Sequence, residues 1–436
     1  MKIFIPIETT HRELLYKVFL CHHLANKGFS CYFGSKYNIS YLIENNKNFI
    51  YLDKGYHLGY SDELYKKIKK NNGLIISLDE EGAVDFSDGS TLRGRYSEHL
   101  FKNSSITFMW GKEQLKLIKE NIFDLDKVFV TGHPRFELLK STYHYLYNDE
   151  INNIKNRFGK FILINTNMGF GNNILGDDFV VENYKNRFKQ INKLISSDKS
   201  KLEHINKFII NLSKKSTMNI VLRPHPEENL SYYNKIFEKI ENIHVLYEGS
   251  AVPWILASEY LIHPDCTTAV ECFISGKMPL SILPKNYDNE LVTHLPLKVS
   301  KCFSSIEEII DFIIKGSKAK IDKETIQLIN EYFSIKTNPL IRITEIINNC
   351  YNQNKTISNS LSFASQINLK LKKIKSLFIS PRFSNDLSRQ KLSGFDSKKI
   401  KMLSEKIKIE NNYLKNIEIN KLNEYLYSFN DYSVKN

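Results

Sequence analysis

Short apolar runs alternate with helical segments over the first 350 residues. The runs are rich in β-branched and aromatic residues, which favour strands, and the segments between them repeat their apolar residues at helical spacing. Residues 10–27, for example, form a helical pattern that ends at Gly28. Strands separated by helices form β-α units with parallel strands. The runs of the first half are KIFIPI (2–7), YFG (32–34), FIYL (49–52), LIIS (74–77), ITFMWG (106–111) and VFVTG (128–132).

A second series of the same kind begins at FILINTN (161–167). Together the two series predict an α/β protein with two doubly wound, Rossmann-like domains, over residues 1–150 and 151–350. We expect the carboxyl ends of their sheets to face each other across a central cleft. The later runs of the second series are NIVLRPHP (219–226), IHVLYEG (243–249), YLIHPD (260–265) and PLSIL (279–283).

Residues 351–436 differ in composition from both series. From Lys355 onward the chain holds 16 Lys and Arg against 7 Asp and Glu, so this segment carries most of the formal net charge of +13. Apolar residues recur at helical spacing in 367–378 and 398–409, with lysines between them. We therefore expect a basic helical tail that packs back on the N-terminal domain or binds an anionic membrane surface. An ordinary solvated tail is the alternative.

The remaining composition indicates a protein kept in the cytoplasm, either free there or peripheral on the inner face of the membrane. The N-terminus lacks the apolar stretch of a signal peptide, and no run approaches the ~18 apolar residues of a membrane-spanning helix. None of the six cysteines forms a C-x-x-C pair or a zinc-type cluster, so we expect no bound metal. No nucleic-acid-binding signature accompanies the basic residues, so no nucleic-acid partner is expected.

Three adjacent acids, Asp79, Glu80 and Glu81, follow the strand LIIS. At the end of a buried strand each is expected to raise the pKa of its neighbours, which suits a general base that holds a proton near neutral pH. A solvated acidic loop is the alternative. Arg93 and Arg95 follow, and they can pair with the acids or hold a substrate carboxylate. Each arginine alone is also compatible with an ordinary surface charge.

The string RPHPEE ends the strand NIVL and contains Arg223, His225 and Pro226. A histidine between two prolines has a restricted backbone, so its ring can be presented to a ligand at little further entropic cost. A guanidinium and an imidazole together suit a phosphate group. We therefore favour a binding role over that of a solvated loop histidine.

The string HPDCTTAVE lies where the strand YLIHPD gives way to a helix, and it contains His263, Asp265, Thr267, Thr268 and Glu271. Threonine hydroxyls beside the unpaired N–H groups of a helix start favour a phosphate site. A glutamate one helical turn on lies on the same face and can accept both ribose hydroxyls. An ordinary capped helix is the alternative.

Two further loops follow predicted strands. TGHPRFELL contains His133 and Arg135 near the predicted cleft, where it either contacts substrate or only shapes a turn. The Gly- and Asn-rich string NTNMGFGNN contains Asn165, Thr166 and Asn167. Its glycines allow close approach to a ligand. It lacks the lysine and the spacing of a P-loop.

The order of these motifs resembles that of bacterial GT-B sialyltransferases, which have a (D/E)(D/E)G motif, then His-Pro, then a Ser/Thr pair. Here the order is Glu80-Glu81-Gly82, His225-Pro226 and Thr267-Thr268. The wider strings LDEEG, TGHPRFEL, RPHPEE and SGKMP are similar to bacterial surface-carbohydrate biosynthesis proteins, which resemble the Kdo transferases of capsule and O-antigen assembly. The resemblance covers roughly residues 1–350 and extends weakly to KLSGFDSKKI (391–400).

The resemblance implies transfer of a CMP-activated nonulosonate-type sugar, such as Kdo or sialic, legionaminic or pseudaminic acid, to a glycan or glycolipid acceptor. Glu80 matches the acid that deprotonates the acceptor hydroxyl, with Asp79 or Glu81 as rival assignments. Sialyltransferases invert and some Kdo transferases retain configuration, so a carboxylate nucleophile is also open. His225 would contact the CMP phosphate and assist its departure. Thr267 and Thr268 would bind the same phosphate, and Glu271 the ribose.

No cofactor or metal is implied, because CMP carries less charge than a nucleoside diphosphate and protein donors can neutralise it. Two other activities suit the same fold, a CDP-glycerol-type polyol-phosphate transferase and a sugar-nucleotide 2-epimerase. A non-catalytic subunit of polysaccharide assembly is the third alternative. The acid cluster favours the glycosyltransferase, since a polyol-phosphate transferase would more naturally use a histidine base.

Overall fold

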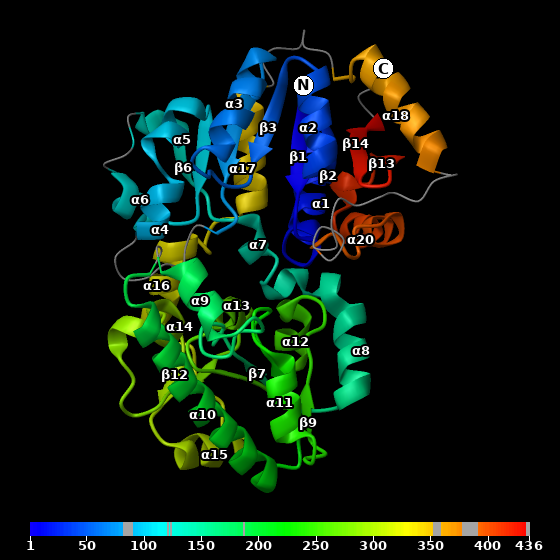
Figure 1. Ribbon diagram of the computed structural model, residues 1–436. Helices are drawn as coiled ribbons and strands as arrows, with labels where there is room; N and C mark the ends of the chain where they lie inside the picture. Colours follow the sequence, from blue (N-terminus) through cyan, green and yellow to red (C-terminus); the bar gives the residue numbers. More distant parts are fainter. Residues whose placement is uncertain are drawn as a thin grey trace. The chain divides into compact units, whose positions relative to one another are not determined.

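The computed structural model describes residues 1–81, 90–119, 122, 124–185, 188–351, 359–376 and 391–432. Of these, residues 1–81, 90–138 and 329–432 form one compact unit, called unit 1 (Figure 1). Residues 139–328 form the second, unit 2. The described part of the chain thus leaves unit 1 once and returns to it, whereas the sequence suggested three consecutive segments.

Unit 1 is built on a sheet with the strand order β13-β14-β2-β1-β3-β4-β5-β6. The six strands from β1 to β6 pair in parallel, and β13 and β14 form an antiparallel hairpin on the free edge of β2. The strands are β1 (Lys2–Ile7), β2 (Ser30–Ser35), β3 (Phe49–Asp53), β4 (Leu74–Leu78), β5 (Ile106–Met109), β6 (Val128–Val130), β13 (Ile417–Asn423) and β14 (Leu426–Asp431).

Helices cover both faces of this sheet, as doubly wound domains require. The first ends at Asn26, close to the predicted stop at Gly28, which has the left-handed φ of +84°. The helices of unit 1 are α1 (Thr10–Asn26), α2 (Lys36–Asn45), α3 (Tyr60–Lys70), α4 (Ser90–Arg95), α5 (Glu98–Asn103), α6 (Lys112–Ile118), α7 (Pro134–Glu137), α17 (Pro339–Tyr351), α18 (Phe363–Ser376) and α20 (Ser397–Glu410), and α16 (Lys323–Phe333) leads into it.

The C-terminal segment belongs to unit 1 and is not helical throughout, which corrects the expected helical tail. The apolar face of α20 is buried through Ile400, Leu403 and Ile407. Nε2 of His22 in α1 lies 2.9 Å from Oγ of Ser404 in α20. Beyond α20 the chain adds the β13–β14 hairpin, in which Phe429 of β14 is fully buried. The hairpin covers the backbone edge of β2, which would otherwise present unpaired N–H and C=O groups.

Unit 2 has a parallel six-stranded sheet in the order β12-β11-β10-β7-β8-β9. Its strands are β7 (Phe161–Asn165), β8 (Asn219–Arg223), β9 (Ile243–Val245), β10 (Tyr260–His263), β11 (Leu280–Ile282) and β12 (Lys301–Phe303). Its helices are α8 (Asn148–Phe158), α9 (Asp177–Tyr184), α10 (Ile191–Lys215), α11 (Leu230–Phe237), α12 (Ala251–Ala257), α13 (Thr268–Ile274), α14 (His294–Lys298) and α15 (Ile306–Ile314).

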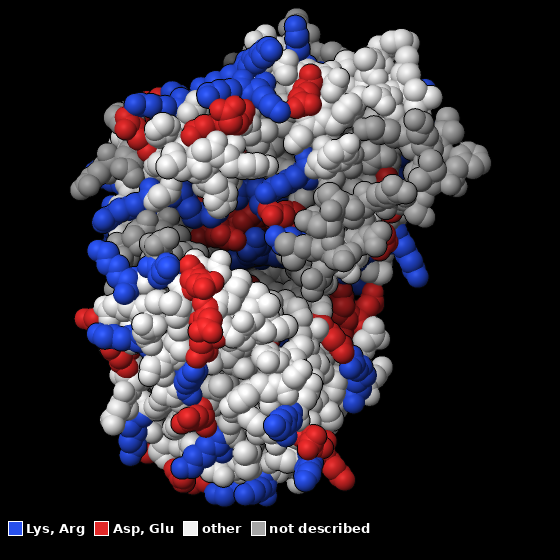
Figure 2. Space-filling model, viewed as in Figure 1, with Lys and Arg blue, Asp and Glu red and all other residues white. Residues whose placement is uncertain are grey.

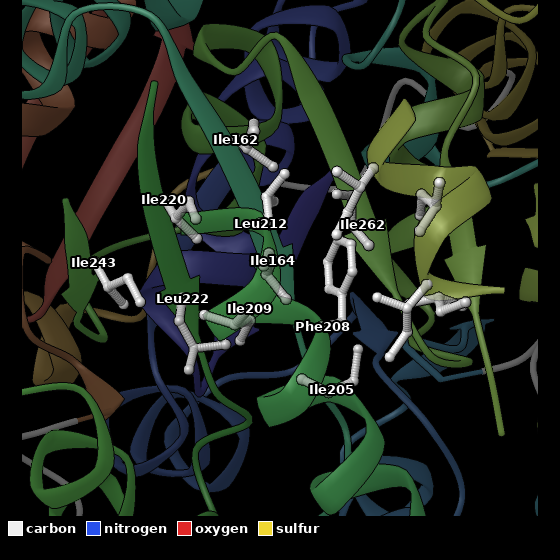
Figure 3. Packing of buried hydrophobic residues seen from close by; sticks show 14 of the residues in the cluster. Ile162, Ile164, Ile205, Phe208, Ile209, Leu212, Ile220, Leu222, Ile243 and Ile262 are labelled. Carbon is white, nitrogen blue, oxygen red and sulfur yellow. The ribbon is translucent and has the colours of Figure 1, made fainter. Parts of the chain in front are cut away.

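The core of unit 2 explains why the long polar segment before β8 is a helix. Phe208, Ile209 and Leu212 of α10 recur at helical spacing and pack on one face of the sheet, against residues such as Ile164 and Leu222 (Figure 3). Burial of such side chains contributes about 1.5–3 kcal/mol each. The predicted α/β class with two Rossmann-like, parallel-sheet units is therefore confirmed.

The strand order of each unit marks where a ligand can enter. In unit 1 the chain runs from β1 to β2 on one side and to β3 on the other; in unit 2 the orders diverge between β7 and β10. Open α/β sheets bind ligands outside the carboxyl ends of the strands at such switch points. Within the described residues, no helix is both long and apolar enough to span a bilayer.

Candidate functional site

The three adjacent acids after β4 have three different environments. Asp79 is buried and receives two hydrogen bonds from Arg95, one of them from Nε to Oδ2 at 2.8 Å. Its backbone carbonyl accepts from Nε1 of Trp110 at 2.8 Å. Asp79 is therefore held on both sides and shapes the loop. Glu81 has 53% of its side chain exposed and pairs with Arg95 and Arg12.

Glu80 lies between these two and is the acid that the fold buries most completely, with 1% of its side chain exposed. Its Oε1 accepts a hydrogen bond from the hydroxyl of Tyr16. Nζ of Lys17 lies 3.1 Å from the same oxygen. Both partners belong to α1, so the packing of this helix on the sheet determines where the Glu80 carboxylate lies.

The pKa values of this cluster differ from the sequence-based expectation. Burial alone would raise the pKa of Glu80, but Lys17 and the hydrogen bond from Tyr16 outweigh it and lower the pKa. Burial also opposes ionisation of Glu81, and there Arg95 and Arg12 lower the pKa. The expectation of raised pKa values was wrong for Glu80 and Glu81, because cations from other elements contact both carboxylates. Glu80 is an ionised carboxylate at neutral pH.

A buried ion-pair network supports this carboxylate, and the sequence reasoning missed it. Glu13 is fully buried, and its carboxylate lies 2.6 Å from Nζ of Lys17 and 2.6 Å from Nζ of Lys54. Its two oxygens also accept from the backbone N–H groups of Glu8 and Thr9. The signal was present in the sequence, since Glu13 and Lys17 stand four residues apart in the predicted helix, where a Glu and a Lys can pair.

A pocket of about 200 Å³ opens at this edge of unit 1. It lies outside the carboxyl ends of β1, β3 and β4, at the switch point of the sheet. Figure 2 shows Lys and Arg side chains gathered with Asp and Glu over unit 1 on the face in view. The pocket's lining includes Arg12, Lys36, Lys54, Tyr60, Glu80 and Glu81.

The remaining predicted residues of unit 1 have different roles. Arg95 lines the pocket, but its guanidinium donates hydrogen bonds to Asp79 and Glu81. Arg93 is exposed. Arg135 is half-buried, with its guanidinium 4.7 Å from the ring centre of Phe136. Gly82 lies outside the described residues. His133 is fully buried, and its Nε2 lies 3.8 Å from Oε2 of Glu80.

In unit 2, Arg223 and His225 are separated by their environments although one residue lies between them. Arg223 is buried, donates to the carbonyl of Gly249 at 3.2 Å, and stacks 5.0 Å from the ring centre of Trp254. It therefore holds the loop between β9 and α12. His225 and Pro226 are exposed; Nδ1 of the imidazole accepts from the backbone N–H of Glu227 at 3.3 Å, which leaves Nε2 as the ring nitrogen that can meet a ligand.

Glu228, in the same RPHPEE string, organises this edge of unit 2. It is buried, and its Oε1 accepts from the backbone N–H of Met168 and of His225, both at 3.0 Å. The hydroxyl of Thr166 donates to the same oxygen at 2.8 Å. Thr166 is thus occupied by a structural contact, whereas the sequence placed it among the nucleotide-binding residues.

Two more residues predicted to bind nucleotide serve the packing of unit 2. His263 is fully buried; its Nδ1 accepts from the backbone N–H of Cys266, and its Nε2 lies 2.8 Å from Oγ of Ser300. Burial lowers the pKa of His263 to about 4. Both oxygens of the buried Asp265 lie within 3.4 Å of Nζ of Lys201.

The other predicted residues of unit 2 do come together, around the start of α13. Asn165 at the end of β7 donates from Nδ2 to Oγ1 of Thr268 at 3.0 Å, and Asn167 donates to the carbonyl of Asp265 at 3.3 Å. Thr267 is exposed. Glu271 is half-buried one turn further along α13. Within the described ranges, the amide oxygens of Asn165 and Asn167 are buried without a hydrogen-bond partner. This edge therefore offers hydroxyl and amide groups to a ligand.

Comparison with known proteins identifies the fold. No family model matches the chain, and no curated protein matches it. The UDP-GlcNAc 2-epimerase of Methanocaldococcus jannaschii matches over 80% of this chain and 100% of its own, with 12% identity and a TM-score of 0.51. Its complex with UDP-GlcNAc and UDP matches over the same shares, with 13% identity and a TM-score of 0.50. The wall teichoic acid polymerase TagF matches over 70% of this chain and 71% of its own at 11% identity, with a TM-score of only 0.40.

The likeness to the two M. jannaschii structures shows a fold of the GT-B type. The predicted fold class is confirmed in this respect. The roles of the individual site residues stay predictions.

Proposed function

We propose that this protein is a glycosyltransferase of surface-polysaccharide assembly, which moves a CMP-activated nonulosonate-type sugar to a glycan or glycolipid acceptor in the cytoplasm. The observation that carries the proposal is the ionised carboxylate of Glu80 beside a polar pocket at the switch point of unit 1. The pocket is the acceptor site, and the edge of unit 2 around α13 is the donor site. Catalysis across both requires the two edges to meet around the substrates.

The pocket's chemistry suits a sugar hydroxyl. Glu80 supplies an acceptor for its proton, and Arg12 and Lys54 add positive charge at the same edge. Tyr60 also lines the pocket with 63% of its surface exposed. An exposed aromatic ring beside a few convergent polar groups is suited to hold the apolar face of a sugar ring and fix its orientation.

In the inverting version of the reaction, Glu80 takes the proton of the acceptor hydroxyl while the hydroxyl oxygen forms a bond to the anomeric carbon of the donor. The bond between that carbon and the phosphate oxygen breaks, and CMP leaves with the electron pair. In the retaining version a carboxylate of the acid cluster attacks first and the acceptor displaces it. Because its pKa is lowered, Glu80 is ionised and ready for either role at neutral pH.

On the donor side, the proposal assigns the phosphate to the exposed Thr267, to Thr268 and to the exposed imidazole of His225. Thr267 and His225 donate hydrogen bonds to the charge that develops on the leaving group, and Thr268 does so by turning its hydroxyl away from Sγ of Cys266, to which it donates at 3.2 Å. Glu271 accepts from the ribose hydroxyls. Arg223, Thr166, His263 and Asp265 position the surrounding loops through the contacts described above and do not touch the donor.

A second candidate function is a sugar-nucleotide 2-epimerase. The specific observation in its favour is the fold likeness to the UDP-GlcNAc 2-epimerase of M. jannaschii, which extends over the whole of that chain. Such an enzyme would use a uridine nucleotide and need no acceptor. The two candidates therefore differ in nucleotide preference and in product.

The test compares nucleotides and products on the purified full chain. A ligand that binds the folded state raises the unfolding temperature according to its concentration and Kd. We expect CMP to stabilise more than UDP, and CMP-Kdo or CMP-sialic acid to release CMP in the presence of an acceptor glycan. Preferential stabilisation by UDP with conversion of UDP-GlcNAc would instead establish the epimerase. No CMP release from any nonulosonate donor would refute the transferase and leave the non-catalytic subunit.

A further inference from the structure

The His133–Glu80 pair contains two buried polar atoms that face each other. Oε1 of Glu80 is engaged by Tyr16 and Lys17. Its other oxygen, Oε2, is buried, and no described residue forms a hydrogen bond with it. The same holds for Nε2 of His133, which lies 3.8 Å away. The separation exceeds that of a hydrogen bond, so the two atoms do not satisfy each other.

The protonation of His133 follows from its second ring nitrogen. Nδ1 accepts a hydrogen bond from the backbone N–H of Arg135 at 3.1 Å, so the proton of the neutral ring is on Nε2. Burial, together with Arg135 and Lys17 nearby, lowers the pKa of His133 well below its ordinary value and keeps the ring neutral. His133 therefore presents an N–H donor toward Glu80, and Glu80 presents a carboxylate acceptor toward His133.

Aromatic rings hold this arrangement in place. The ring of His133 lies 4.9 Å from that of Tyr16 and 5.1 Å from that of Trp110, measured between centroids. Trp110 is fixed in turn by its hydrogen bond to the carbonyl of Asp79. The imidazole thus has little freedom to turn away, and an unmet donor and acceptor in such an interior are each unfavourable.

A hydroxyl oxygen matches both atoms at once, because it accepts one hydrogen bond and donates another. Two hydrogen bonds of about 2.8 Å can bridge any separation up to about 5.6 Å. At the 3.8 Å between these atoms, they would meet at the oxygen at roughly a right angle. A small opening of the gap brings that angle toward the tetrahedral value. An ammonium group or a carbonyl would satisfy only one of the two atoms.

We propose that Oε2 of Glu80 and Nε2 of His133 bind a single hydroxyl oxygen between them, with His133 as the donor and Glu80 as the acceptor. The oxygen comes from the acceptor sugar or from a water molecule. In the first case the inference rests on the proposed function and gives His133 a part in the reaction. His133 then holds the oxygen while its proton moves to Oε2 of Glu80 and the oxygen bonds to the anomeric carbon.

The test is a high-resolution crystal structure of the full chain, determined alone and with an oligosaccharide acceptor. We expect an oxygen within hydrogen-bonding distance of both atoms. Density in the protein alone that persists with the acceptor identifies a water, and density continuous with the acceptor identifies its hydroxyl. A direct hydrogen bond between His133 and Glu80 with no oxygen between them would overturn the inference.

Two variants keep the test independent of crystals. His133→Gln retains an amide donor, whereas His133→Phe removes it. With the acceptor hydroxyl as the bound oxygen, we expect His133→Phe to lower kcat for transfer at least tenfold and to leave stabilisation by CMP unchanged, with partial rescue in His133→Gln. If transfer is never seen but the bridging oxygen is, the proposed function fails and this inference stands. Equal transfer rates in all three proteins would overturn the assignment to the acceptor.

Discussion

Nζ of Lys17 lies 3.1 Å from Oε1 of Glu80, and both side chains are buried, with 2% and 1% of their surface exposed. The same nitrogen lies 2.6 Å from Oε2 of Glu13 and donates to the carbonyl of Pro6 at 2.8 Å. One ammonium group therefore serves two buried carboxylates, with Lys54 as a further cation for Glu13. An unpaired charge in such an interior costs several kcal/mol. The ionised state of Glu80, after β4, therefore depends on Lys17 of α1, which precedes it by more than one β-α unit.

Replacing Lys17 by methionine is expected to destabilise the protein by about 3–5 kcal/mol, because it leaves Glu80 and Glu13 without their shared partner. The measurement is the free energy of unfolding in urea at pH 7. Lys66→Met is the matched control, since Lys66 pairs with Glu63 while 73% of its side chain is exposed. We expect the control to change stability by no more than about 0.5 kcal/mol. A Lys17→Met protein as stable as the wild type would show that these carboxylates are not ionised in the fold.

The same network predicts how stability depends on pH. The pKa values of Glu13 and Glu80 are both lowered, since Lys17 and neighbouring cations outweigh the effect of burial. A carboxyl whose folded pKa is below the unfolded value of about 4.3 contributes stability above that pH, and the contribution is lost as the pH falls through the folded pKa.

Urea unfolding over a series of pH values should therefore show a steep loss of stability below about pH 4.3. In Glu80→Gln the loss should be shallower, because one of the responsible groups no longer titrates. Glu63→Gln, with 72% of the glutamate side chain exposed in the wild type, should leave the profile as it was. Identical acid profiles for wild type and Glu80→Gln would contradict the lowered pKa of Glu80.

The fold was largely predictable because its signals are local. Every parallel strand except β12 overlaps one of the predicted apolar runs, and α1 begins at Thr10, where the helical pattern began. The β13–β14 hairpin was missed because a basic, Asn-rich composition dominates the C-terminal segment. The strand pairing that determines the structure of this segment is non-local, since β14 pairs with β2, which lies near the other end of the chain.

The site was predictable only in part, for a related reason. A sequence shows which residues follow a strand, and those residues do line the sheet edges here. It does not show their partners: Asp265 and Lys201 stand 64 residues apart, and no spacing rule connects them. His263 sits on a strand end like the others, but its ring packs inward on Ser300. Residue type and strand position were therefore enough to predict the two sheet edges. They led to too large a number of side chains predicted to be available to a ligand.

For the proposed reaction, Glu80→Gln is expected to lower the transfer rate by about 10²–10⁴, because the amide cannot accept the proton. The protein should still fold, since Lys17 retains Glu13. Stabilisation by CMP should be unchanged because Glu80 belongs to unit 1 and the donor groups to unit 2. Glu81→Gln is the matched control, with 53% of Glu81 exposed, and its effect should be at most tenfold. A larger loss in Glu81→Gln than in Glu80→Gln would reassign the base.

On the donor side, Thr268→Val keeps the side-chain volume and removes the hydroxyl at the start of α13. We expect CMP binding to weaken by about 0.5–1.5 kcal/mol, the net contribution of one hydrogen bond, and stability to fall by a similar amount, because the hydroxyl also accepts a hydrogen bond from Asn165. Lys201→Met should leave CMP affinity unchanged and lower stability more strongly, because it breaks the buried pairs with Asp265 and Asp198. Isothermal titration with CMP, combined with urea unfolding, separates the two effects. Unchanged CMP affinity in Thr268→Val would remove this threonine from the donor site.

The C-terminal segment is expected to bind anionic membranes weakly and only through charge. The apolar face of α20 is buried inside unit 1 through Ile400, Leu403 and Ile407, so it is not available to insert into a bilayer. Lys398 and Lys401 on the same helix are exposed, and each basic residue near an anionic surface contributes about 1 kcal/mol. Flotation with vesicles that contain phosphatidylserine should therefore fall as salt is added.

The double variant Lys398→Glu/Lys401→Glu should reduce this flotation, and neutral vesicles should bind neither protein. The double variant Lys66→Glu/Lys67→Glu, which makes the same charge change on an exposed helix of unit 1, serves as the comparison. Salt-resistant flotation, or equal binding to neutral and anionic vesicles, would mean that apolar contacts carry the association. The buried face of α20 would then have to leave unit 1, and the variant Ile407→Ala, which loosens that packing, should increase binding.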